Sequence, residues 1–383
     1  MFNRLIFSIL KDYYHIMSLK TNTSLDPKDT QLLSVFTAHF QGELNLARVR
    51  LICLFITALC KVKSVSYSKL SSGFASKSLA DSCFRRIQRF MSEAELPMRL
   101  VATLIFKLLP QHDSLVLVMD RTNWKFGKKN INILMLGISY KNVAIPLMFR
   151  MLDKRGNSNT GERIALVKDF IGWFGKDCIN CLLADREFIG EDWLGFLNDN
   201  NIRYHIRIRN NFKIFLPRKQ VEVTAWHLFN SLKINELRHY EQIVRMHGQL
   251  CYLSGIKTVI DGKVEFLMLV SFNRPWEALD DYKKRWQIEM LFKAMKSSGF
   301  NIEDTHVTAL DRLEKLILLT MVAFVWCYKI GDYIDTQIKP IKIKKHGRRA
   351  VSVFKYGLDY ISECLLSGFN KLNINLMSFL SCT

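Results

Sequence analysis

The feature that most constrains the fold is a pair of short apolar runs, each of which ends in an aspartate. Residues 114–120 read SLVLVMD and residues 178–185 read CINCLLAD, so both have the length of a strand and are almost continuously apolar. Such a run is typical of a strand that is buried on both faces of a sheet. The sequence therefore predicts a sheet covered by helices, with Asp120 and Asp185 at the ends of two of its strands.

The segments around these runs predict a mixed sheet. Two apolar strands, 130–141 and 142–152, follow the first run and turn at Lys141-Asn142. Two amphipathic helices and a further strand then alternate with the second run; these segments are 163–175, 190–201 and 203–209. A meander of three strands followed by strand–helix–strand units gives a mixed sheet with helices on its faces.

The rest of the chain divides around this sheet. A peripheral segment (1–26) precedes a helical region (27–110), and the sheet core (111–209) is interrupted by a β-rich insertion (210–278). Asp261-Gly262 in the insertion is a hairpin signal. The core resumes over 279–330, and a basic C-terminal region covers 331–383. The role of that last region is open; DNA contact or dimerisation are the two options.

Net charge indicates a polyanionic partner. The formal charge is +20, from 55 Lys and Arg against 35 Asp and Glu. Nucleic acid is the leading candidate because release of counterions from phosphates contributes a large free energy, and an anionic membrane surface is the second. The apolar run 316–328 is too short to span a bilayer and predicts a core helix. We expect no membrane partner.

Cysteine usage predicts a cytoplasmic protein. Nine cysteines are present, and only Cys178 and Cys181 are close together, as C-x-x-C. No second pair follows, so core packing is the favoured interpretation over half of a zinc site or a redox pair. Free cysteines in this number suit a reducing compartment. We expect a cytoplasmic protein.

In the helical region, three arginines occupy positions i, i+1 and i+4 of an expected helix: Arg85, Arg86 and Arg89. Arg85 and Arg89 share one face of the expected helix. This layout suits a helix-turn-helix-like contact with DNA, and an ordinary helical bundle with a basic exterior remains an equal alternative.

Residues 281–300 predict a helix with an ordered polar edge. At about 100° per residue, Tyr282, Arg285, Glu289 and Lys296 fall within roughly 60° of one another. Trp286 flanks this edge, and the core stripe contains Ile288, Leu291, Phe292 and Met295. Taken alone, the helix also fits a solvated face on which Arg285 and Glu289 pair across one turn.

Together the acidic residues favour a metal site. A lone aspartate after a strand is usually a turn residue or a helix cap, but two at the ends of neighbouring strands repel each other and call for a cation. Glu289 would add a third carboxylate. Hard oxygen ligands select Mg²⁺ or Mn²⁺, and two such ions about 3.5–4 Å apart support phosphodiester chemistry.

Three motifs resemble the DDE transposases of bacterial insertion sequences: DRTNWKFG from Asp120, ADREF around Asp185 and YKKRWQIEMLFKAMK from Tyr282. The third matches the Y-x2-R-x3-E-x6-K signature of the insertion-sequence-four family at every fixed position. The resemblance covers about residues 115–330. Glu187 departs from it, because relatives tend to have glycine after the Asp-Arg pair.

The resemblance implies an α/β protein with a ribonuclease-H-like mixed-sheet core, an inserted β-subdomain and an all-helical N-terminal DNA-binding domain. It implies that Asp120, Asp185 and Glu289 bind two Mg²⁺ ions, and that Tyr282, Arg285 and Lys296 hold DNA near the cleaved end. Trp286 matches the aromatic residue on which a flipped base stacks; packing in the core is the alternative for this side chain.

Three functions follow from these expectations. The first is a cut-and-paste transposase that cleaves through a hairpin intermediate and transfers strands, acting as a homodimer on double-stranded DNA at terminal inverted repeats and a target. The second is a ribonuclease-H-like nuclease that only hydrolyses DNA. The third is a non-catalytic protein that occupies transposon ends.

Overall fold

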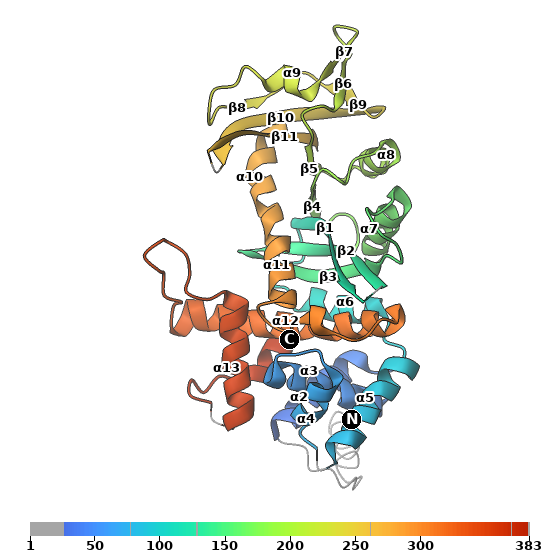
Figure 1. The fold of residues 1–383 in the computed structure, drawn as a ribbon, viewed down its shortest axis with the longest axis vertical. Coiled ribbons are helices and arrows are strands. Elements are labelled where there is room, and N and C mark those ends of the chain that lie inside the picture. The colour runs from blue at the N-terminus through green and yellow to red at the C-terminus, as the bar shows by residue number, and fades with distance from the viewer. Residues whose placement is uncertain (1–26, 77, 128, 261, 369, 382–383) are drawn as a thin grey trace, which may run out of the picture.

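The computed structural model describes residues 27–383 except 77, 128, 261, 369, 382 and 383. The expected peripheral segment 1–26 lies outside this range. The described chain is elongated, with a helical part at one end, a β-rich part at the other and the mixed sheet between them (Figure 1).

The core sheet has the predicted meander followed by parallel strands. Its strands are β1 (Leu115–Phe126), β2 (Lys129–Tyr140), β3 (Val143–Met151), β4 (Ile179–Ala184) and β5 (Tyr204–Ile208). They lie in the order β3-β2-β1-β4-β5, with β1, β2 and β3 antiparallel and β1, β4 and β5 parallel. The prediction of a mixed sheet is confirmed, and so is the turn after Tyr140, where Lys141 adopts a left-handed φ of 51°.

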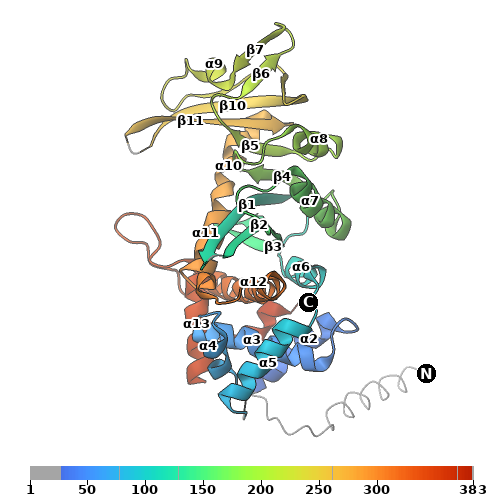
Figure 2. The same ribbon diagram turned by 45° about the vertical axis from the view of Figure 1, so that its right-hand side comes forward.

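Helices cover both sides of this sheet. The helices α7 (Thr160–Phe174) and α8 (Glu191–Asp199) lie to one side, and α10 (Ala278–Tyr282) and α11 (Gln287–Lys296) lie to the other (Figures 1 and 2). A capping box starts α7, in which the side chain of Asn159 accepts from the N–H of Glu162 and the Glu162 carboxylate accepts from the N–H of Asn159.

The strands of residues 210–278 extend the same sheet. They are β6 (Lys213–Leu216), β7 (Val221–Thr224), β8 (Leu237–His239), β9 (Val244–Met246), β10 (Gln249–Ile260) and β11 (Lys263–Phe272), with the short helix α9 (Ala225–Phe229). The link is β11, which pairs with β5. The expected hairpin joins β10 and β11 through the Ile260–Lys263 pair, and Asp261 of its turn lies outside the described residues.

A helical layer closes the other end of the sheet. It contains α2 (Pro27–Phe40), α3 (Leu46–Val62), α4 (Tyr67–Gly73), α5 (Ala80–Glu93), α6 (Met98–Lys107), α12 (Leu310–Tyr333) and α13 (Val353–Ser367). The apolar run 316–328 lies within α12 and is buried throughout, as predicted for a core helix. Since α12 packs against α3, α5, α6 and α13, helices from both ends of the chain share one core.

The C-terminal region is a folded element with one projecting loop. Helix α13 crosses α12 closely: a Cβ at Gly357 would lie 1.8 Å from the carbonyl oxygen of Cys327. The indole N–H of Trp326 donates to the carbonyl of Leu376, near the short 3₁₀ turn Leu376–Leu380. The basic segment between the turn Ile334–Ile338 and α13 projects from the body of the protein (Figure 1). Among the described helices, none combines the length and apolar character that crossing a membrane requires.

Candidate active site

The register of β1 and β4 places Asp120 beside Asp185. Met119 of β1 pairs with Ala184 of β4 in parallel. Asp120 follows the first of these residues and Asp185 follows the second. The expectation that β1 ends at Asp120 is wrong. This strand continues to Phe126 because β2 pairs with it along its whole length, and Asp120 lies opposite Met135. Asp120 therefore stands where β1 loses its β4 neighbour and keeps its β2 neighbour.

The helix that carries Glu289 is divided. The expected helix 281–300 is formed by α10, one 3₁₀ turn (Lys283–Trp286) and α11, which ends at Lys296. Ile288, Leu291 and Met295 are buried, as the apolar stripe predicts, and α11 packs against β1, β2 and β3. The polar edge of the helix consequently faces the strand on which Asp120 lies.

Arg285 joins two of the three carboxylates. Its Nη1 donates to Asp120 Oδ2 at 3.3 Å and its Nη2 donates to Glu289 Oε1 at 2.6 Å. The guanidinium is buried, with 5% of the side chain exposed, whereas Glu289 is 40% exposed. The expected pair between Arg285 and Glu289 is therefore present, but the same arginine also connects the helix to the sheet.

The electrostatics of Asp120 are those of a confined carboxylate. Its pKa is raised to about 6: burial is the main cause and the neighbouring Glu187 and Asp185 contribute to the rise, while the N–H of Arg121 and the Arg285 guanidinium oppose it. Asp185 Oδ1 is buried and has no hydrogen-bond partner. Such an oxygen costs free energy unless a donor or a cation reaches it. The donor set, three carboxylates with one orphaned oxygen, fits a divalent cation that prefers hard oxygen ligands.

The three acids do not converge as tightly as a bound ion requires. Among the described residues, the group whose ligand atoms all lie within 4.8 Å of one another is Cys181, His205 and Asp281. Asp120 and Glu289 are instead held apart by the Arg285 guanidinium. Joint ligation of an ion by all three carboxylates would thus require Arg285 to leave its place between them.

Two charged residues of this site were not identified as site residues from the sequence. The Nε and Nη2 of Arg121 bind Glu187 at 3.2 and 3.3 Å, and its Nη1 donates to Asn132 Oδ1 at 3.1 Å. The signal was available, since Arg121 follows Asp120 and Glu187 lies two residues after Asp185. The turn at 186–188 contains no left-handed residue, so a glycine is not required where Glu187 stands.

The remaining residues of the helical signature differ in accessibility. Tyr282 is 4% exposed, and its ring lies 5.8 Å from the Arg285 guanidinium carbon. Trp286 is 59% exposed, so the alternative that it packs in the core is wrong. Lys296 donates to the Asn123 carbonyl at 3.0 Å and pairs with Glu303 at 2.7 Å.

The buried group around Asp281 is an ion-pair network. Asp281 Oδ2 lies 3.6 Å from His205 Nε2 and 3.8 Å from Cys181 Sγ. The same carboxylate pairs with Arg203 at 3.5 Å and with Lys284 at 2.8 Å. Although burial opposes its ionisation, His205 and Lys284 hold the pKa of Asp281 well below its usual range. Since two cations already neutralise Asp281, we interpret the group as a tether between α10 and the core strands.

The cysteines of the C-x-x-C pair have different environments. Cys181 belongs to the Asp281 network, and burial followed by the Asp281 charge raises its pKa to about 12. Cys178 instead contacts the Gly175 carbonyl at 3.2 Å. The two thiols therefore do not act together as a metal or redox pair.

The arginines of the N-terminal helices lie apart from the carboxylates. Arg85 and Arg89 are exposed on α5, and Arg86 is half-buried. Figures 1 and 2 place α5 in the helical layer, beyond α12 from the core sheet. The structure thus brings together Asp120, Asp185, Arg285 and Glu289, but not these three arginines.

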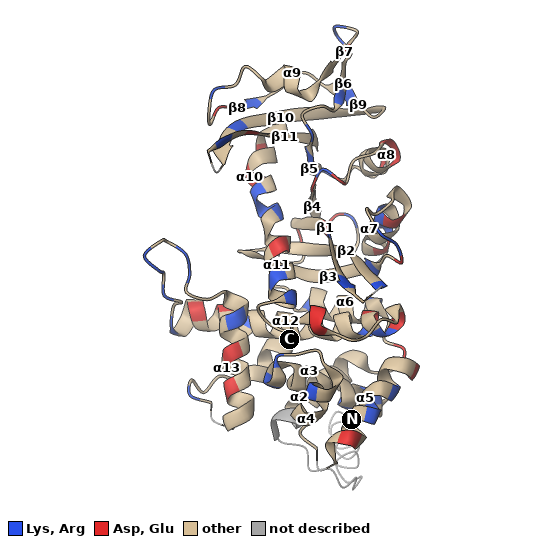
Figure 3. Ribbon diagram, in the orientation of Figure 1, with Lys and Arg blue, Asp and Glu red and all other residues tan. Residues whose placement is uncertain are grey.

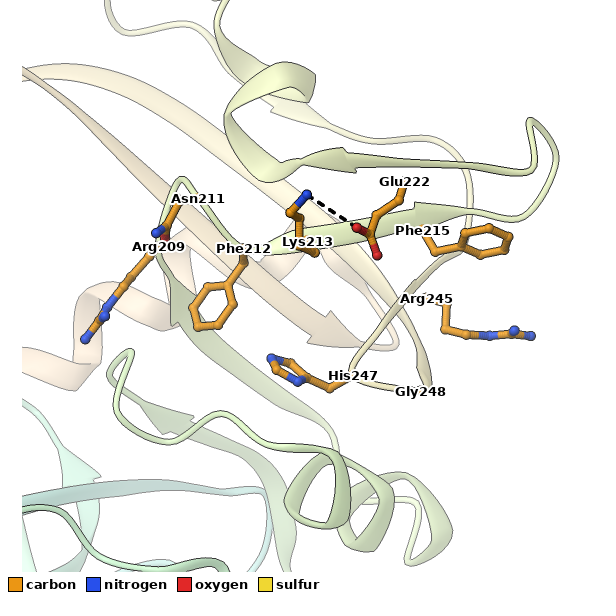
Figure 4. Close-up of a pocket in the computed structure, with 9 residues that line it drawn as sticks. All are labelled: Arg209, Asn211, Phe212, Lys213, Phe215, Glu222, Arg245, His247 and Gly248. Carbon is orange, nitrogen blue, oxygen red and sulfur yellow. Dashed lines mark ion pairs between the residues drawn. The ribbon is translucent and has the colours of Figure 1, made fainter.

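A pocket on the outer strands is also separate from the carboxylates. It has a volume of about 490 Å³ and lies against β6, β7 and β9 (Figure 4). Its lining residues are Arg209, Asn211, Phe212, Lys213, Phe215, Glu222, Arg245, His247 and Gly248. Lys213 is paired with Glu222 at 3.4 Å. None of the site residues expected from the sequence lines this pocket.

Residues 111–326 match a protein-family model described as "Transposase DDE domain". The match covers more than half of the 383 residues and contains the strands of Asp120 and Asp185 and the helix of Glu289. Among curated proteins, none matches the chain.

Proposed function

Since the chain belongs to the DDE transposases, which cleave and join DNA in metal-dependent reactions, we propose a specific reaction for it. We propose that it moves an insertion sequence of the insertion-sequence-four family by a cut-and-paste route. Asp120, Asp185 and Glu289 are the proposed metal ligands, for two Mg²⁺ or Mn²⁺ ions. Cleavage through a hairpin intermediate and strand transfer to a target are the proposed reactions.

One observation carries the proposal for the site. A single guanidinium, that of Arg285, binds both Asp120 and Glu289, although 169 positions separate these two acids in the chain numbering. Asp185 follows the β4 residue that pairs with Met119, and one of its oxygens is buried without a partner. Like charges gather at this density at functional sites, where a cation compensates them.

The side chains of the site have distinct proposed roles. Without bound ions, Arg285 neutralises the carboxylates of the site. When ions bind, its guanidinium instead binds a DNA phosphate. Tyr282 is buried against Arg285 and supports the guanidinium rather than contacting DNA itself. Trp286 exposes its ring beside the site and offers a surface for a displaced base. When bound, the two ions supply activation of the water or 3′-hydroxyl and stabilisation of the leaving oxygen.

The test is a joining assay with a labelled duplex that carries one end of the element, taken from the DNA flanking the reading frame. The wild-type protein with Mg²⁺ is expected to cleave this end and transfer it to a second duplex. Glu289→Gln is expected to bind the end with near wild-type affinity but to lose cleavage, because the neutral amide is a poor ligand for a hard cation. Glu241→Gln, at an exposed position outside the site, is the matched control.

The outcomes separate the candidate functions. Strand transfer by the wild type supports a transposase, cleavage without transfer would point to a nuclease, and binding alone to a non-catalytic protein at transposon ends. Full cleavage by Glu289→Gln would contradict the ligand assignment. Since two ends must meet, we also propose a DNA-bound homodimer, which mass measurement of the protein–end complex would check.

A further inference from the structure

A groove of about 1060 Å³ runs along the exposed side of the helix that carries Glu289. Its walls come from α11, the turn at 297–301, the N-terminus of α13 and the loop that projects between Ile338 and α13. Met290, Lys293 and Ala294 are the α11 residues that line it. Lys293 lies one helical turn after Glu289, and both side chains are solvent-accessible. Glu289 itself does not line the groove, whose nearest lining residues on α11 are Met290, which follows it directly, and Lys293, one turn further along.

The projecting loop makes this groove basic. Residues 336–358 contain seven Lys and Arg and no Asp or Glu. Figure 3 shows this loop at the left edge of the molecule, with much of its length in blue. Of the residues that line the groove, Lys63, Lys293, Arg348, Arg349 and Lys355 are cationic, and none is acidic. The lining thus presents cations from α11, from the loop and from α13.

Only part of this charge is neutralised inside the protein. Arg349 pairs with Asp335 at 2.7 Å. Asp359 forms ion pairs with Lys63 at 2.6 Å and with Lys355 at 2.8 Å. Within the described residues, Lys293, Lys344 and Arg348 form no ion pair. These three side chains remain available to an external anion.

The loop is held in shape by its backbone. Lys344 N–H donates to the Arg348 carbonyl at 2.8 Å, and Ala350 N–H donates to the Lys342 carbonyl at 2.8 Å. At its base, Ile341 N–H donates to the Asp335 carboxylate at 2.7 Å. Ser352 caps α13, whose first residues line the groove, so the positive end of a 15-residue helix also faces it. The cations are therefore presented on a preformed support.

We propose that this groove binds the phosphate backbone of DNA next to the catalytic carboxylates. The inference rests on the proposed function, because it assigns a second stretch of the same substrate to the protein. In the described part of the chain, Lys293 and Arg348 line the open groove without an ion pair, and Lys344 adds a further unpaired cation on the loop beside it. Such a spread of cations suits a polymer of phosphates, since each contacted phosphate releases counterions. The bound DNA is either the element end or the target, and both have this chemistry.

The test compares two triple variants that remove the same charge. Lys344→Ala, Lys345→Ala and Arg348→Ala neutralise the loop, while Lys107→Ala, Lys168→Ala and Lys176→Ala neutralise exposed positions on and near α6 and α7. Affinity for a labelled element end and for an unrelated duplex is measured at several salt concentrations. Each lost phosphate contact should reduce the slope of log K against log salt by about 0.9. We expect the magnitude of this slope to fall by about two to three in the loop variant and to change little in the control.

The readouts assign the groove and separate this inference from the proposed function. Weaker binding and slower cleavage of the element end would assign the groove to that end. Normal cleavage with lost strand transfer and weaker binding of the unrelated duplex would assign it to target DNA. If the loop variant keeps the slope of the control for both duplexes, the inference is wrong even where the wild type cleaves DNA. A wild type that does not cleave would instead contradict the proposed function. Thermal unfolding checks that both variants fold.

Discussion

Replacing Asp120 by asparagine is expected to stabilise the fold at neutral pH while abolishing DNA cleavage. Mainly through burial, and with the nearby Glu187 and Asp185 contributing, the pKa of this carboxyl is raised from its ordinary 3.8 to about 6, although the N–H of Arg121 and the Arg285 guanidinium oppose the rise. With 18% of the side chain exposed, solvent screens little of this effect. The protein therefore keeps an unfavourable charge in the site, as is common where function requires it.

The magnitude follows from the two pKa values. A pKa raised from 3.8 to about 6 corresponds to about 3 kcal/mol, at about 1.4 kcal/mol for each tenfold change in proton affinity. The folded protein holds this proton more tightly than the unfolded chain does. Its contribution to stability is thus fully present below about pH 4 and is lost as the pH rises through about 6. Asparagine avoids that loss, but Arg285 then loses one partner, so we expect a gain of about 1–3 kcal/mol.

Urea unfolding of wild type and Asp120→Asn, with a chelator present, measures this difference at about pH 7.5 and about pH 4. The variant should be the more stable protein at the higher pH and nearly equal at the lower. Asp113→Asn, at an exposed position before β1, is the control and should change little at either pH. Added Mg²⁺ should stabilise the wild type more than the variant, because it binds the folded site.

A variant that is less stable at about pH 7.5, or a difference of the same size at both pH values, would refute the reasoning. The first result would mean that the hydrogen bonds of the Asp120 carboxylate outweigh the cost of its burial. The second would mean that ionisation of this group is not the source of the effect.

Three further predictions concern the surroundings of the site. Lys296→Ala should weaken DNA binding and reduce the slope of log K against log salt by up to about one. Glu303→Gln, which frees Lys296 from its ion pair, should strengthen binding. Unchanged slopes in both variants would exclude a phosphate contact. Trp286→Ala should leave the unfolding midpoint unchanged but slow end cleavage by about tenfold to a hundredfold, with Trp286→Phe close to wild type; equal loss in both would argue against stacking. Asp281→Asn should destabilise the fold by about 3 kcal/mol in urea, because buried Arg203 keeps Glu277 but loses its second carboxylate partner, and Lys284 loses its acidic partner as well. A neutral result would contradict the tether.

The sequence by itself determined the elements and most of the acidic site. Continuous apolar runs specified β1 and β4, and a period of about 3.6 residues specified the buried stripe of α11, because burial on two faces or one stripe leaves a local pattern. The positions of Asp120 and Asp185 after these runs followed from the same pattern. The spacing of Tyr282, Arg285, Glu289 and Lys296 located the charged helix without any tertiary information.

Only the tertiary structure decided which charges meet. Asp120 lies within β1 rather than at its end, because the length of β2, and not the local sequence, sets how far β1 extends. The double contact of Arg285 depends on how α11 packs on the sheet, and the Asp281 network joins residues from three separate elements. Local sequence encodes the periodicity of one element, whereas the distance between charges on different elements is set by strand register and helix packing, which no local pattern contains.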